Sequence, residues 1–200
     1  IDVTSAVRAI ATSRGIRAAE SDASVSLNVF GMAIDGADVG GFHYTGDSVR
    51  RLADLEAAGA ACAKEFTSVA LGNLGARAAE SYSGPVLFAP DAFLELFVSP
   101  VVSAASAIAV QRGRSPLAGR LGTSIAAEAL DIHDDPLDRE LAGAGAFDRE
   151  GHPCRRYALV ERGVLRGFLY NAYAAAVEKR ASTGHAKGTP RSLPGLGPHA

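Results

Sequence analysis

The chain has 200 residues, and its 20 Lys and Arg nearly balance its 22 Asp and Glu, giving a formal net charge of −2. The sequence has no run of basic residues that would create a positive electrostatic potential and attract nucleic-acid phosphates. This argues against a nucleic-acid-binding protein. The two cysteines form neither a CxxC pair nor a disulfide framework, so we expect a reducing, cytoplasmic setting. The longest apolar run, residues 101–110, falls short of the ~20 residues of a membrane span, and no signal peptide is evident.

The first part of the chain predicts strands followed by one long helix. Residues 7–10, 16 and 25–34 have the composition of short strands, and apolar and polar residues alternate at 25–29. From Asp47 the apolar residues are spaced three and four apart, which predicts a helix with Asp47 or Ser48 as its cap. Gly72 and Gly75 each cost a helix about 1 kcal/mol relative to Ala, so we expect it to end between them.

The central part predicts a strand, a helix and a loop. Residues 85–89 are uniformly apolar and predict a buried strand. Pro90 then begins a second helix, which Pro100 should break or bend because proline lacks an N–H. Residues 111–122 predict a polar, Gly-rich loop, and residues 124–132 predict a further strand before an acidic turn.

The last part predicts a hairpin followed by a short helix. Residues 155–160 and 164–169 are strand-like and are separated by Glu161, Arg162 and Gly163, a three-residue loop that ends in Gly. Asn171 has the chemistry of an N-cap for a helix over 172–180, on which Tyr173, Ala176, Val177 and Arg180 share one face.

These elements together predict an α+β fold. We expect an antiparallel-rich sheet with two main helices packed on it, followed by a β-hairpin and short helix of a C-terminal β-rich domain. Residues 1–82 should be the end of an N-terminal α+β domain, and residues 83–200 the start of the C-terminal domain. Because the chain opens at Ile1 without an initiator Met, we expect a piece of a longer protein.

Two polar loops flank the hairpin and helix. Phe147-Asp148-Arg149-Glu150-Gly151 resembles the FDxEG element of the TldD/PmbA (modulator of DNA gyrase) family, and Ser182-Thr183-Gly184-His185-Ala186 resembles its STGxA element. The hairpin between them resembles the family's GVLxxxL element. Four earlier segments are similar to family elements in the same order: residues 13–15, 84–90, 110–122 and 130–136.

The resemblance carries expectations about function. In this family a TldD-type subunit carries a zinc-binding HExxxH helix and cleaves peptides, and a TldE-type subunit pairs with it without that motif. The segment of this chain that corresponds to the helix, residues 90–97, contains no His. The resemblance therefore implies a TldE/PmbA-like, non-catalytic subunit with no cofactor of its own, a TldD-like partner that holds zinc, and a peptide or unfolded polypeptide as substrate.

The two loops supply the candidate binding residues. A peptide could add a strand beside them, held by backbone hydrogen bonds, although the same groups also suit turns and strand ends. We expect the peptide to contact Asp148, Glu150, Gly151, Ser182, Thr183, Gly184 and His185.

The sequence gives no candidate catalytic residue or metal ligand. No two of the five histidines stand at i,i+4, and we interpret His152 with Cys154, and His133 beside Asp134, as structural or solvated groups. Ser182 and Thr183 lack a nucleophile elbow. Glu150 would serve as a general base only if a partner brought the metal.

Two other functions remain open. One is a divergent, self-sufficient metallopeptidase that recruits His152, Cys154 or His185 together with ligands from outside this sequence; zinc content and peptide cleavage without a partner would favour it. The other is a peptide-binding module with no protease partner, which peptide binding without copurification of an HExxxH protein would favour.

Overall fold

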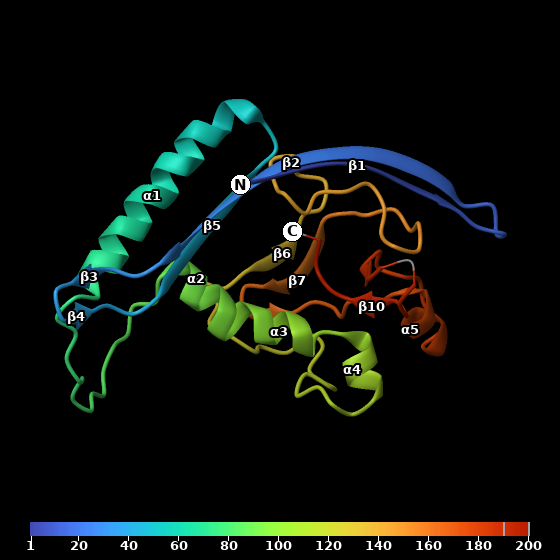
Figure 1. The fold of residues 1–200 in the computed structure, drawn as a ribbon. Helices are drawn as coiled ribbons and strands as arrows, with labels where there is room; N and C mark the ends of the chain where they lie inside the picture. The colour runs from blue at the N-terminus through green and yellow to red at the C-terminus, as the bar shows by residue number, and fades with distance from the viewer. Residues whose placement is uncertain (190, 200) are drawn as a thin grey trace. The chain divides into compact units, whose positions relative to one another are not determined.

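The computed structural model describes residues 1–189 and 191–199, and it divides into two compact units. The first unit contains residues 1–7 and 21–86, and the second contains residues 8–20 and 87–200. Figure 1 labels the elements of both units. Each unit is described by itself below.

The first unit contains most of a three-stranded sheet and one long helix, while residues 8–11 of the first strand and 17–20 of the second belong to the second unit. Strands β1 (Asp2–Ala11), β2 (Arg17–Gly31) and β5 (His43–Val49) form a sheet in the order β1-β2-β5, and β3 (Ile34–Asp35) pairs with β4 (Asp38–Val39). Helix α1 (Leu55–Gly72) packs along β5. The buried core is small, with Leu27 from β2 against Ala58 and Cys62 from α1.

The long helix begins later than predicted. Asp47 and Ser48 are not its cap, because both lie in β5, where they pair with Leu27 and Ser26 of β2. A 3-10 turn, η1 (Leu52–Asp54), intervenes before α1. The strand continues to Val49 because its backbone groups find partners in β2, and the Ser48 hydroxyl lies 2.8 Å from that of Ser26. The predicted end of the helix is confirmed at Gly72.

The second unit combines short helices with a small antiparallel sheet. Strands β6 (Ile132–Asp134), β7 (Tyr157–Glu161) and β8 (Val164–Leu165) form a sheet in that order, and β9 (Ala186–Lys187) pairs with β10 (Gly195–Leu196). The helical elements are α2 (Pro90–Phe93), the π-helical turn η2 (Leu94–Val98), α3 (Ser99–Ala104), α4 (Ala107–Gln111) and α5 (Ala172–Val177). The buried core gathers Leu159 and Val160 of β7, Leu165 of β8, and Ala174 and Ala175 of α5.

The C-terminal hairpin and helix form where the sequence predicts them, with shorter elements. The turn has two residues instead of three, because Glu161 belongs to β7 and both Arg162 and Gly163 take positive φ, 49° and 72°. The Asn171 cap is confirmed, since its side chain accepts a hydrogen bond from the Ala174 amide at 2.8 Å. Helix α5 ends at Val177, before the predicted Arg180.

Two predicted strands are absent from the described chain. Residues 85–89 form no strand, and the Leu87 side chain is 99% exposed, so the apolar run there is not buried. Residues 124–132 contribute only a bridge from Ser124 to Val164 before β6 begins. Pro100 lies at the start of α3, directly after the π-helical turn, so the helix changes its geometry there and continues.

The α+β fold class is confirmed by the antiparallel sheets and helices of this structure. Across the residues it describes, none of the helices is both long enough and apolar enough for a membrane crossing.

Candidate functional site

The two loops singled out in the sequence lie side by side in the second unit. The Arg149 amide donates to the Ala186 carbonyl at 3.1 Å, and the Ala186 amide donates to Asp148 Oδ2 at 3.1 Å. The fold therefore brings together the FDREG and STGHA segments, which the hairpin and α5 separate along the chain.

The acidic side chains of the first loop serve its own structure. Asp148 is 1% exposed, and its Oδ1 accepts from the amides of Glu150 and His152, both at 2.9 Å. Glu150 Oε2 accepts from the Ala172 amide at 2.7 Å, in the first turn of α5. These carboxylates satisfy backbone donors that would otherwise be unpaired. Gly151 closes the turn with φ +84°. Peptide contact by these residues stays a prediction.

The second loop is fastened to Tyr170 in the same way. Ser182 Oγ donates to the Tyr170 carbonyl at 3.1 Å, and Thr183 Oγ1 accepts from the Tyr170 amide at 2.8 Å. Gly184 takes φ +76°, and a Cβ there would lie 2.9 Å from the Pro153 carbonyl oxygen, so this position requires glycine. His185 is 1% exposed, which leaves Ser182 and Thr183 as the side chains of this loop nearest to open space.

A cationic cavity opens beside this loop. It has a volume of about 400 Å³, and its walls include Ser182, Thr183 and the guanidinium-bearing side chains of Arg155, Arg166 and Arg180. Arg180 is oriented by Tyr170, whose hydroxyl accepts from its Nη1 at 2.8 Å. Arg166 Nε lies 3.2 Å from Glu161 Oε2 and Arg180 Nη1 lies 3.6 Å from Glu178 Oε2, so part of this positive charge is already balanced. Guanidinium groups bind carboxylates through paired N–H donors, so Arg155 is the wall residue that best suits a further anionic group.

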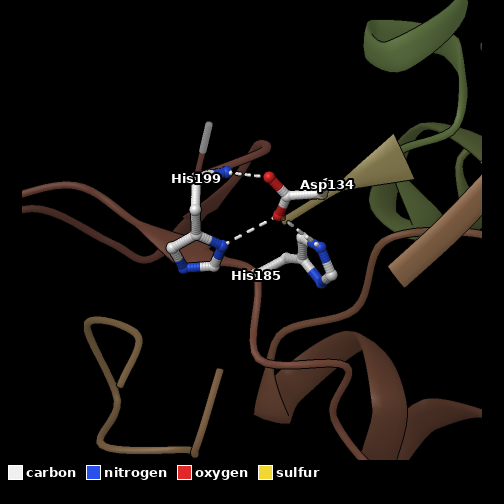
Figure 2. A group of neighbouring side chains, drawn as sticks. All are labelled: Asp134, His185 and His199. Atoms are coloured by element: carbon white, nitrogen blue, oxygen red, sulfur yellow. Dashed lines mark hydrogen bonds and ion pairs between the residues drawn. The ribbon is translucent and has the colours of Figure 1, made fainter. Parts of the chain in front are cut away.

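A second group of chemically active side chains lies buried in the same unit. Asp134 at the end of β6, His185 just before β9 and His199 after β10 place their donor atoms within 4.8 Å of one another. Asp134 Oδ2 lies 3.1 Å from His185 Nε2 and 3.0 Å from His199 Nδ1, and both imidazoles face this carboxylate in Figure 2. The three side chains are at most 5% exposed.

The outer atoms of both imidazoles are also engaged. His185 Nδ1 lies 2.8 Å from Thr183 Oγ1, and His199 Nε2 lies 3.3 Å from Cys154 Sγ. Burial, with a smaller contribution from the Asp148 carboxylate, raises the pKa of the Cys154 thiol to about 11. Cys154 is therefore a protonated thiol at neutral pH.

The sequence did not reveal this cluster. The pairing of β9 with β10 aligns Ala186 with Leu196 and so brings the neighbourhoods of His185 and His199 together. Asp134 arrives separately, through the pairing of β6 with β7. Such a group has no local spacing signal, because each donor comes from a different segment and none shares a helix face with another.

Comparisons with known proteins place this unit in a family. Residues 81–200 match the model of the PmbA/TldA metallopeptidase C-terminal domain. The chain is 40% identical over 119 residues to an uncharacterized protein of Methanocaldococcus jannaschii, covering 59% of this chain and 28% of that protein. It is 30% identical over 119 residues to a metalloprotease PmbA homologue of Buchnera aphidicola, covering 60% of this chain and 26% of that protein.

Solved structures share the fold. A Thermotoga maritima protein, described as a proposed modulator of a DNA gyrase, matches this chain with a TM-score of 0.82 and 27% identity, over 96% of this chain and 42% of that one. TldE from Thermococcus kodakarensis matches in fold with a TM-score of 0.77 and 23% identity, over 98% of this chain and 44% of that one. The chain thus spans between about a quarter and a half of the length of these relatives.

The family model covers more than half of the chain, and the family resemblance carried by the two loops is confirmed. The chain belongs to the PmbA/TldD metallopeptidase family.

Proposed function

We propose that this chain is part of a TldE/PmbA-like subunit of a cytoplasmic TldD/TldE metallopeptidase complex. A TldD-like partner holds the zinc and cleaves the peptide, and this subunit helps to enclose the peptide or unfolded polypeptide during degradation or precursor processing. Membership of the PmbA/TldD metallopeptidase family supports a role in a metallopeptidase. The observation that carries the finer assignment is the composition of the helical segment from Pro90 to Val98.

That segment does not fit a zinc ion of the HExxxH type. A catalytic zinc is held by about three protein ligands and supplies hydroxide by lowering the pKa of its bound water. The helical segment offers Asp91 and Glu95 as its titratable side chains and contains no imidazole. This segment therefore lacks the pair of histidines that holds the helix-borne metal in a TldD-type subunit. That difference supports a partner subunit as the source of the metal.

The cationic cavity supports the peptide-enclosing role. Two of the residues expected to contact peptide, Ser182 and Thr183, line it together with three arginines. A peptide carries carboxylates at its C-terminus and on its acidic side chains, and these are the groups that guanidinium ions bind most specifically. The cavity therefore supplies anion contacts next to the STGHA loop.

Reconstitution with full-length proteins tests the proposal. We expect a stable complex with a TldD-like protein that carries HExxxH, and cleavage of an unfolded polypeptide by the mixture but not by this subunit alone. A partner whose HExxxH glutamate is replaced by Gln serves as the control that abolishes cleavage without abolishing the complex. Failure to form a complex, with peptide binding retained, would instead indicate a stand-alone peptide-binding module.

One observation favours a second candidate function. Asp134, His185 and His199 present two imidazoles and a carboxylate within 4.8 Å, the ligand types of a catalytic zinc site. A self-sufficient metallopeptidase would therefore not need the helical segment. Cleavage by the purified zinc-loaded protein, in the absence of any partner, would support this alternative and overturn the first.

A further inference from the structure

We infer that Asp134, His185 and His199 form a binding site for a divalent transition-metal cation of the zinc class, separate from the helix-borne zinc site of the family. The inference goes beyond the proposed function, because it concerns ion binding by this chain alone and requires neither a partner nor peptide cleavage.

The donor set selects the class of ion. Two imidazole nitrogens and one carboxylate oxygen suit zinc and its first-row neighbours, whereas magnesium and calcium prefer oxygen ligands. Ligand atoms about 2.0–2.1 Å from a tetrahedral zinc lie roughly 3.4 Å from one another. The observed separations from Asp134 Oδ2, 3.1 Å to His185 Nε2 and 3.0 Å to His199 Nδ1, are a few tenths of an ångström shorter. All three donor atoms lie within 4.8 Å of one another, so side-chain shifts would be needed to bring the three of them onto one ion.

Thr183 holds the outer nitrogen of His185 and leaves Nε2 facing Asp134. The Thr183 hydroxyl accepts from the Tyr170 amide at 2.8 Å and can donate its single hydrogen to the Tyr170 carbonyl at 3.2 Å. Its contact with His185 Nδ1 at 2.8 Å joins two atoms of which either can donate, depending on the tautomer of the ring. The tautomer with its hydrogen on Nδ1 leaves Nε2 as the nitrogen that can bind a metal.

Within the described residues, His185 Nε2 has no hydrogen-bond partner of acceptable geometry, although it is buried and lies at ion-pair distance from Asp134. In the tautomer that leaves Nε2 unprotonated, its lone pair is directed at a carboxylate oxygen, which is repulsive in a buried site. A cation between the two atoms would be attracted to both. The orphaned nitrogen is thus an observation independent of the grouping of the donors.

His199, the third donor residue, is positioned by contacts of its backbone amide and of its Nε2 atom. The His199 amide donates to Asp134 Oδ1 at 2.9 Å, and His199 Nε2 contacts Cys154 Sγ at 3.3 Å. Thr183 and Cys154 therefore occupy the outer positions of the two imidazoles. Metal binding by His199 Nδ1 requires the ring hydrogen on Nε2, with Cys154 Sγ as its acceptor. Both rings are oriented before any ion arrives.

A cavity provides room for a non-protein ligand. It has a volume of about 500 Å³, is lined mainly by aliphatic side chains of η2, α3 and β7, and reaches Asp134 and Pro198. An ion with three protein ligands can keep a fourth position for water. The site would join β6 to the segments that flank β9 and β10, so that ion binding stabilises this part of the fold.

Metal titration of the full-length protein tests the inference. The protein is stripped with a chelator, purified without any partner, and titrated with zinc chloride by calorimetry. We expect about one equivalent of tightly bound zinc, and a loss of affinity of at least about tenfold in His185→Gln and Asp134→Asn. His152→Gln, a histidine outside the cluster, should bind zinc like the parent protein. Equal zinc binding by His185→Gln and the parent would overturn the inference.

A spectroscopic measurement on the parent protein covers the case in which the variants fail to fold. Cobalt(II) bound by two imidazoles and a carboxylate gives visible d–d absorption without a thiolate charge-transfer band. Absence of stoichiometric cobalt or zinc binding would show that the cluster is only a hydrogen-bonded Asp–His network. A charge-transfer band would show that Cys154 is a ligand and that the donor set proposed here is wrong. Neither outcome depends on complex formation or cleavage, so the proposed function is tested separately.

Discussion

At the scale of single residues, side chains satisfy backbone amides both near to them and far from them along the chain. The Asn171 side chain caps α5 by accepting from the Ala174 amide three residues later. The burial of Asp148 and His185 depends on the docking of two loops that are distant in the chain. A motif in the sequence identified these loops, but it did not distinguish residues that face a ligand from residues that hold the loops together.

Asp148 illustrates the structural role. Its two oxygens accept hydrogen bonds from the amides of Glu150, His152 and Ala186. We expect Asp148→Ala to lower the free energy of unfolding by about 2–4 kcal/mol, because buried donors lose their acceptor. Urea denaturation measures the change, and Glu80→Ala, at an exposed acid, should change stability little. If Asp148→Ala lowered the free energy of unfolding no more than Glu80→Ala does, the buried amides of the loop would have found other acceptors.

Cys154 gives a dependence on pH. Its pKa is about 11 in the folded chain and 9.0 in the reference state, so the folded state retains the proton longer. The associated stability is fully present below pH 9 and is lost as the pH rises toward 11, by roughly 1–3 kcal/mol. Urea denaturation at a series of pH values between 9 and 11 compares the chelator-treated parent protein with Cys154→Ala, which lacks the titrating group. Parallel pH profiles of the two proteins would contradict the prediction.

At the scale of elements, periodicity located the helices better than it located the strands. Helix α1 and its end at Gly72 follow from the spacing of apolar residues and from the cost of glycine. The apolar run at residues 85–89 predicts a buried strand, yet the structure has no strand there. The prediction failed because an apolar run does not show whether a partner strand is present. The start of α1 was misplaced for a related reason, since β2 extends β5 through Asp47 and Ser48.

The turn between β7 and β8 allows a matched test of backbone geometry. Gly163 has φ +72°, and a Cβ there would lie 2.4 Å from the Ala126 carbonyl oxygen. Gly163→Ala should lower the free energy of unfolding by about 2–5 kcal/mol, from left-handed strain plus the clash. Gly113 has φ +65° with open space around it, so Gly113→Ala should cost only about 1–2 kcal/mol. Equal losses by denaturation would show that the β7–β8 turn moves away from Ala126.

At the scale of the whole molecule, the proposed peptide-binding cavity is built from segments that are remote in sequence. The cationic cavity gathers Leu121, Arg155, Arg166 and Arg180 around the STGHA loop. Composition alone does not reveal it, because the formal net charge is only −2 and the arginines are dispersed along the chain. The assignment to a metallopeptidase family, by contrast, came from short ordered motifs that the sequence does carry.

Arg155 offers a test of this cavity in the full-length protein. We expect Arg155→Ala to weaken binding of an unfolded peptide with a free C-terminal carboxylate by about two- to fivefold, since one exposed ion pair is removed. The amidated peptide should not distinguish the variant from the parent if the C-terminal carboxylate is the bound group. Arg114→Ala, at an exposed arginine outside the cavity, is the matched control in fluorescence anisotropy. An unchanged affinity for the free acid would place the peptide elsewhere.

The pairing of β9 with β10 has a consequence for how the end of this chain is secured. Each strand is only two residues long, and a ribbon that short does not hold itself together in water. Its closure relies on contacts outside the ribbon: the His199 amide donates to Asp134 Oδ1 at 2.9 Å, and the Ala186 amide donates to Asp148 Oδ2 at 3.1 Å. Loss of these two contacts should release the ribbon first, so its amide protons should exchange with solvent well before those of β7.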